Sequence, residues 1–145
     1  MACPVCSQPY DNEERIKIVL IGREDMCYVC YNITPKVIAL DFDATLADYD
    51  GWKGSDHKGR LLDGAKEFLE ELVSLGFELV IVTARPIEGI QEWLEENKID
   101  HLIKAVSNMK IGAFCYIDDR AITFHNNYEE TLEKIKNFTP WYKNK

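Results

Sequence analysis

The pattern of apolar and polar positions along the chain changes near residue 35. Beyond that point, four short and nearly continuous apolar runs are typical of strands buried on both faces of a parallel sheet. They cover residues 37–40, 77–82, 102–106 and 113–117. Segments with apolar residues at helical spacing predict helices over residues 64–75, after Pro86, and around Tyr128, Leu132 and Ile135. This alternation predicts an α/β domain over residues 36–145, with a Rossmann-like, mostly parallel sheet and flanking helices.

Local signals add detail to these predicted elements. Asp63 is suited to cap the start of the first helix, and Gly76 is suited to end it. Trp93 falls on the apolar side of the second helix, so we expect it in the core. Cys115 lies inside the apolar run 113–117, and we expect a buried packing thiol there.

The first 35 residues have a different pattern, dominated by two cysteine pairs. Twenty residues separate the pair Cys3 and Cys6 from the pair Cys27 and Cys30. Two residues between thiolates let a tight turn direct both sulfurs at one ion, and four thiolates form a closed tetrahedral Zn²⁺ site. Alternating polar and apolar residues at 15–20 predict a strand in the spacer. We therefore expect a zinc-ribbon-like element over residues 1–35, with disulfides or incidental thiols as the alternatives.

Charge and composition limit the classes of partner. The 145 residues include 17 Lys and Arg against 25 Asp and Glu, a net charge of −8, which argues against a broad nucleic-acid surface. No apolar stretch approaches the roughly 20 residues of a membrane span. The first residues show neither a basic nor an apolar secretory region, so we expect a cytoplasmic protein with no membrane partner.

Two of the predicted strands end in acidic residues. Asp41 and Asp43 follow the first strand and point the same way in extended chain, and Asp118 and Asp119 follow the fourth. If these strands are neighbours, three or four carboxylates converge and repel one another unless a cation balances them. Mg²⁺ prefers such oxygen ligands. The alternative is that these acids are solvated loop residues.

These segments together resemble the four ordered motifs of the haloacid dehalogenase-like hydrolase superfamily. The motifs match D-F-D-A-T at 41–45, Thr83 in V-I-V-T-A-R, Lys110 in S-N-M-K, and the acid pair in Y-I-D-D-R-A-I at 116–122. The resemblance spans about residues 36–126. Ala44 departs from it, because many members have glycine there, although a small residue is kept.

The resemblance implies a role for each matching residue. Asp41 would attack phosphorus and form an aspartyl-phosphate, and Asp43 would protonate the leaving oxygen and then activate water. Asp41, the carbonyl of Asp43 and Asp118 would ligate Mg²⁺, with Asp119 supporting the metal or its water. Thr83 and Lys110 would hold the phosphoryl oxygens. Arg85 and Arg120 stand beside these motifs as substrate contacts or structural partners.

The spacing of the motifs leaves no room for a large cap domain. Thirty-nine residues separate Asp43 from Thr83, and a helix and a strand use nearly half of them. The remainder, chiefly 46–62, can form a loop or hairpin flap that contains Tyr49 and Trp52. These aromatic residues would either contact the substrate or anchor the flap itself.

The sequence therefore favours a capless Mg²⁺-dependent phosphatase with a zinc-ribbon-like element. Its substrate would be a phosphorylated small molecule or macromolecular end, and the ribbon could contact a protein partner. Two alternatives remain: an interaction module that binds a phosphorylated partner with little turnover, and a nucleic-acid end phosphatase.

Overall fold

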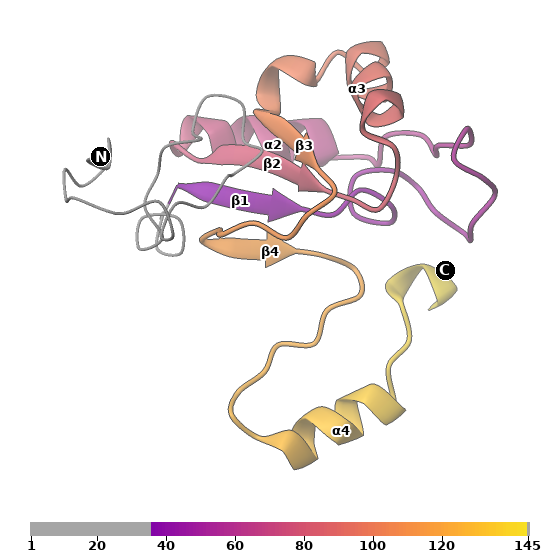
Figure 1. Ribbon diagram of the computed structural model, residues 1–145, viewed down its shortest axis with the longest axis vertical. Helices are drawn as coiled ribbons and strands as arrows, with labels where there is room; N and C mark the ends of the chain where they lie inside the picture. The colour runs from indigo at the N-terminus through magenta and orange to yellow at the C-terminus, as the bar shows by residue number, and fades with distance from the viewer. Residues whose placement is uncertain (1–35, 145) are drawn as a thin grey trace, which may run out of the picture.

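The computed structural model describes residues 36–144 (Figure 1). The zinc-ribbon-like element predicted for residues 1–35 lies outside them. The described elements are, in chain order, β1 (Val37–Leu40), α2 (Ala65–Ser74), β2 (Glu78–Val82), α3 (Ile87–Glu96), the 3₁₀ helix η1 (Asp100–Leu102), β3 (Ala105–Ser107), β4 (Cys115–Ile117), α4 (Tyr128–Lys136) and the 3₁₀ helix η2 (Trp141–Asn144).

The four strands form one parallel sheet in the order β3-β2-β1-β4 (Figure 1). A parallel sheet with flanking helices confirms the α/β class predicted from the apolar pattern. Three strands are shorter than predicted, and β2 begins at Glu78. Leu102 belongs to η1, so β3 begins at Ala105, and β4 begins at Cys115.

One hydrophobic core joins the sheet to α2 and α3. The register pairs Ile38 with Leu79 and Leu40 with Ile81, so these four side chains share one face of the sheet. Leu69 of α2, together with Ile90, Trp93 and Leu94 of α3, belongs to the same buried cluster. Trp93 is a core residue, as predicted.

The ends of α2 differ in how well the sequence predicts them. Asp63 does not cap the helix; its carboxylate accepts a hydrogen bond from Arg60 at 3.1 Å instead. Gly64 holds the N-cap position with a φ of 85°, without a side-chain cap. Gly76 has a φ of 92° and donates its N–H to the Val73 carbonyl, so the predicted glycine stop is confirmed.

The expectation of a buried Cys115 is wrong. β4 is an edge strand of the described sheet, and Cys115 is exposed on it as a free thiol. The apolar run 113–117 suggested a strand covered on both faces, whereas among residues 36–144 nothing pairs with the outer edge of β4.

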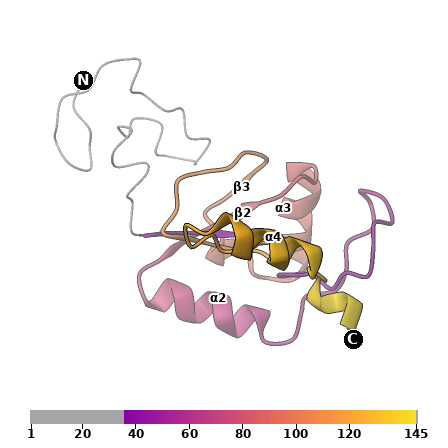
Figure 2. The same cartoon turned by 90° about the horizontal axis from the view of Figure 1, so that it is seen from below.

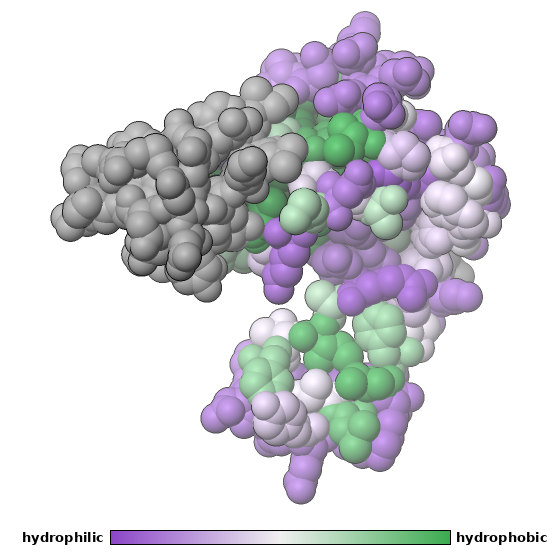
Figure 3. Space-filling model, viewed as in Figure 1, coloured by the Kyte–Doolittle hydropathy of each residue, from purple (hydrophilic) through white to green (hydrophobic). Residues whose placement is uncertain are grey.

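The C-terminal helix α4 lies beyond the β4 edge. Figure 1 shows it below β4, and Figure 2, which faces this edge, shows it in front of the sheet with α2 to one side. None of its residues is buried, and its apolar side chains are exposed (Figure 3). Asn127 caps it by accepting a hydrogen bond from the Glu130 N–H.

No helix within residues 36–144 is long and apolar enough to cross a membrane.

Candidate active site

The site lies where β1 and β4 end side by side. Leu40 of β1 is in register with Ile117 of β4, and the N–H of Asp41 donates to the Ile117 carbonyl at 2.9 Å. Asp118 and Asp119 follow directly after Ile117. The two acidic strand ends are therefore neighbours, because parallel strands direct their carboxyl ends to the same edge of a sheet.

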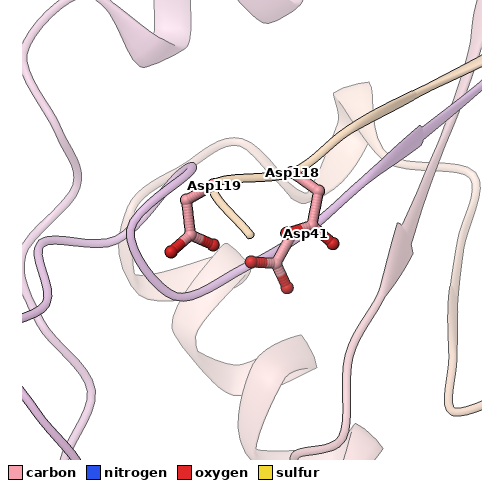
Figure 4. A group of neighbouring side chains, drawn as sticks. All are labelled: Asp41, Asp118 and Asp119. Atoms are coloured by element: carbon pink, nitrogen blue, oxygen red, sulfur yellow. The ribbon is translucent and has the colours of Figure 1, made fainter. Parts of the chain in front are cut away.

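Three of the predicted acids form one cluster. Asp41, Asp118 and Asp119 each offer a carboxylate oxygen, and these oxygens lie within 4.8 Å of one another (Figure 4). Burial, a hydrogen bond with Asp119 and the negative charge of Asp118 raise the pKa of Asp41 from 3.8 to about 8. The cluster therefore holds a proton at neutral pH when no cation is bound.

The donor set of this cluster fits a hard divalent cation. It offers only carboxylate oxygens, the ligands that Mg²⁺ prefers, and a bound cation would replace the proton as the compensating charge. The Nε of Arg120 lies 3.9 Å from an oxygen of Asp119, but the Arg120 side chain is 56% exposed. Solvent therefore screens this pair, and it balances the cluster weakly.

Asp43 lies apart from the three-acid cluster, in a bidentate pair with Arg85. Nε of Arg85 donates to one carboxylate oxygen at 2.8 Å and Nη2 donates to the other at 3.0 Å. The Arg85 side chain is only 4% exposed. The carboxylate of Asp43 is thus held in a fixed orientation beside the cluster.

Thr83 follows β2 at the same edge of the sheet and is buried. Its hydroxyl oxygen accepts the N–H of Arg85 at 3.1 Å, which leaves the O–H free to donate. The Asn108 amide donates to the carbonyls of Thr83 at 2.6 Å and Arg85 at 2.8 Å. These bonds fix the turn that follows β2.

Lys110 lies beside an aromatic side chain of β4. Its ammonium nitrogen lies 5.3 Å from the centroid of the Tyr116 ring. It lies between β3 and β4, on an exposed stretch of the chain.

Ala44 shows why the turn after Asp43 favours a small residue. Its φ of 61° lies in the left-handed region, which L-residues adopt at a cost and glycine adopts freely. The turn is held by a hydrogen bond from the Ala44 N–H to the Ala47 carbonyl at 2.8 Å. The side chain of Ala44 is also buried. A larger residue would therefore face both the cost of the positive φ and the lack of space.

The predicted flap is a loop closed at its base. Ala47 and Leu61 form an antiparallel bridge, and the N–H of Asp48 donates to the Arg60 carbonyl at 2.8 Å. A Cβ on Gly59 would lie 1.8 Å from the Asp48 carbonyl oxygen, so only glycine fits this neck. The indole of Trp93 donates to the Gly59 carbonyl at 2.9 Å and ties the flap to the core.

A cavity of about 250 Å³ lies between the flap and the strand ends. It is lined by Asp41, Asp43, Tyr49, Trp52, Thr83, Ala84, Arg85, Asp119 and Arg120. Sites in open α/β sheets occur in such crevices beyond the carboxyl ends of the strands. The predicted nucleophile, acid and phosphate-binding threonine therefore share one cavity.

The sequence profile of haloacid dehalogenase-like hydrolases matches residues 38–145. The chain belongs to this family. The matched range includes the three-acid cluster, Asp43, Thr83 and Lys110.

Other comparisons add a structural relative of this hydrolase. A conserved protein from Bacteroides thetaiotaomicron is similar in structure, with 24% sequence identity and a TM-score of 0.48. The match covers 70% of this chain and 89% of that chain. Among curated proteins, no sequence matches this chain significantly.

Sequence reasoning left Arg85 unassigned and did not find two C-terminal contributors to the site of this hydrolase. The indole of Trp141 donates to the Ala44 carbonyl at 2.8 Å, and Tyr142 is buried against Tyr49 with ring centroids 5.2 Å apart. The Tyr142 hydroxyl also accepts a hydrogen bond from Arg120. The available signals were the position of Arg85 two residues after Thr83 and a Trp-Tyr pair in a polar C-terminal segment.

Proposed function

We propose that this hydrolase is a Mg²⁺-dependent phosphatase that cleaves a phosphomonoester through an aspartyl-phosphate on Asp41. The observation that supports this most directly is the cluster of Asp41, Asp118 and Asp119, with oxygens within 4.8 Å of one another, beside a cavity that also holds Asp43 and Thr83. Phosphoryl transfer requires mainly an in-line nucleophile, charge neutralisation and proton management.

Asp41 is the proposed nucleophile. Its raised pKa keeps it protonated without a cation, so the nucleophilic carboxylate forms when a cation takes the place of the proton. Mg²⁺ held by Asp41, Asp118 and the carbonyl of Asp43, with Asp119 supporting the metal or its water, would neutralise charge on the phosphoryl oxygens. Attack by an Asp41 oxygen then forms the acyl-phosphate bond and breaks the bond to the leaving oxygen.

Asp43 is the proposed acid and base. It lines the same cavity as Asp41 and is not part of the three-acid cluster. Because both of its oxygens accept hydrogen bonds from Arg85, one of these bonds must open for Asp43 to carry a proton. It would give a proton to the leaving oxygen and later take one from the water that cleaves the aspartyl-phosphate. Arg85 is a positioning residue in this scheme, because it holds both oxygens of Asp43.

Thr83 and Lys110 are the proposed phosphate-binding residues. The Thr83 hydroxyl lines the cavity and has a proton to donate to a phosphoryl oxygen. Lys110 is proposed from its motif position in the segment between β3 and β4. The ammonium would then reduce repulsion between Asp41 and its anionic target.

The test is a panel of phosphorylated metabolites assayed for phosphate release with and without Mg²⁺. We expect at least one ester to be hydrolysed only with Mg²⁺, and Asp41→Asn to lower kcat by a factor of about 10³ or more. Asp63→Asn, which alters an exposed acid before α2, is the matched control and should retain activity. Unchanged turnover in Asp41→Asn, or no turnover together with stable capture of a phosphorylated partner, would overturn the proposal.

A further inference from the structure

The flap presents an exposed aromatic ring to the cavity. Trp52 is 60% exposed, although it lines the cavity that holds the acidic cluster. Leaving so large an apolar ring in solvent gives up the stabilisation that burial would provide. A ligand that covers the ring would recover it.

One face of the Trp52 ring is nevertheless in contact with Arg85. The guanidinium carbon of Arg85 lies 4.7 Å from the centroid of its ring, within the range of a cation–π contact. Arg85 is itself buried and is fixed by its bidentate pair with Asp43. The indole is therefore oriented by Arg85, which also holds Asp43, the proposed acid.

The flap backbone around Trp52 is anchored to the same arginine. Nη1 of Arg85 donates to the carbonyls of Gly54 at 3.4 Å and Ser55 at 3.3 Å. At the neck, the Trp93 indole holds the Gly59 carbonyl. The indole is thus positioned before any ligand binds, which lowers the entropy cost of stacking on it.

From this geometry we propose that the substrate is a nucleoside monophosphate whose base stacks on the exposed face of Trp52. Given the phosphatase proposed above, the ester phosphate would lie at Asp41 and the nucleoside would be the leaving group. Planar bases stack on aromatic side chains through their π faces, and each stacked base contributes about 1–3 kcal/mol.

The size and charge of the site favour a single nucleotide over a polynucleotide end. The cavity of about 250 Å³ lies just below the usual range for drug-sized ligands. Two cationic side chains, Arg85 and Arg120, line it together with three acids, so attraction of phosphate depends on the cation proposed above. The net charge of −8 argues against the extended basic surface that a longer strand requires.

The experiment compares kcat/KM for adenosine 5′-monophosphate with that for ribose 5-phosphate, the same ester without the base. We expect the wild-type protein to prefer the nucleotide by roughly 5- to 150-fold, the range that stacking of one base supplies. Trp52→Leu should bring the ratio close to one, chiefly through KM, and Trp52→Phe should retain most of it. Tyr128→Leu, an exposed aromatic on α4 outside the cavity, should leave the ratio at its wild-type value.

Equal efficiency on the two esters in the wild-type protein, or a preference that survives Trp52→Leu, would overturn the proposal. Higher efficiency on a 5′-phosphorylated tetranucleotide than on the mononucleotide would overturn the assignment to a small substrate. If neither ester is hydrolysed, the metabolite panel tests the phosphatase proposal separately, and calorimetric binding of the same two compounds decides this one. Tighter binding of the nucleotide supports the stacking site, and equal binding contradicts it.

Discussion

At the scale of single residues, the site is defined by the different surroundings of two carboxylates, Asp41 and Asp43. Burial, a hydrogen bond with Asp119 and the negative charge of Asp118 raise the pKa of Asp41 to about 8. Asp43, two positions later, meets the guanidinium of Arg85 at 2.8 Å. Carboxylates so close in sequence can take different chemical roles because their surroundings differ.

The raised pKa of Asp41 predicts how Mg²⁺ stabilises the protein at different pH values. Unfolded Asp41 ionises near 3.8, so the folded metal-free protein binds one more proton between about pH 4 and 8. Its free energy of unfolding therefore falls as the pH rises through this window. Mg²⁺ must displace that proton, so its affinity rises over the same range. At a fixed Mg²⁺ concentration, the increase in Tm should be larger at pH 8 than at pH 6.

Thermal denaturation of wild type and Asp41→Asn checks this prediction. The variant cannot titrate at this position and should show a smaller Mg²⁺ effect with little pH dependence. A Tm increase that is equal at pH 6 and pH 8 in the wild-type protein would argue against a metal at Asp41.

Arg85 gives a second prediction at this scale. Arg85→Lys keeps the charge but loses the planar fork that holds both oxygens of Asp43. We expect kcat to fall of the order of tenfold to a hundredfold through misplacement of the acid. Arg60→Lys, whose exposed pair with Asp63 is solvent-screened, is the control and should keep kcat. Wild-type kcat in Arg85→Lys would show that the bidentate pair does not position Asp43.

The acids were predictable from sequence because they follow apolar runs, and their convergence follows from strand adjacency alone. The role of Arg85 was not predictable, because its partner Asp43 lies 42 positions away and the pairing depends on how the turn after β2 meets the turn after β1. The bond from Trp141 to Ala44 spans 97 positions and depends on the path of the C-terminal segment. Such contacts have no local sequence signal.

At the scale of elements, apolar periodicity predicted all four described strands and the three longer helices. It did not predict which faces and ends of the elements are covered by neighbouring parts of the chain. Cys115 shows this limit, because an apolar run is the same in a central strand and in an edge strand, and neighbours in space decide which it becomes. Asp63 shows a second limit. Its carboxylate could accept a hydrogen bond from the N-terminus of α2 or from Arg60, and it accepts one from Arg60.

A comparison of two helices tests the described packing. Leu69 of α2 is fully buried in the core, whereas Leu132 of α4 is 51% exposed. Leu69→Ala should lower the free energy of unfolding by about 2–5 kcal/mol. Leu132→Ala should lower it by less than about 1 kcal/mol. Both substitutions keep a good helix former, so chemical denaturation isolates the packing difference. A large loss in Leu132→Ala would indicate that another surface covers α4.

At the scale of the whole molecule, the negative net charge is compatible with a site that binds phosphate. The net charge of −8 argues against an extended basic surface, but three of the acids form one cluster, and a cation bound there would attract phosphate. The cavity beside the acidic cluster is lined by residues of the described domain, 36–144.

The four N-terminal cysteines give a prediction for the full chain. We propose that Cys3, Cys6, Cys27 and Cys30 bind one Zn²⁺, because two C-x2-C pairs supply a closed four-thiolate set. Purified protein should contain about one zinc per chain by elemental mass spectrometry, and Cys27→Ser should lose most of it. Cys115→Ser, which alters the exposed thiol on β4, should retain it. Zinc-free protein, or equal zinc in both variants, would contradict the proposal.

The central claim is that Asp41 forms a covalent phosphoryl intermediate. The most direct measurement is to quench a reaction with Mg²⁺ and a hydrolysed ester in acid within the first turnover and to locate the added phosphoryl group by peptide mass spectrometry. The account predicts one phosphoryl group on Asp41 that accumulates before steady state and is absent in Asp41→Asn. Phosphate release without any phosphorylated peptide, or a phosphoryl group on another residue, would contradict it.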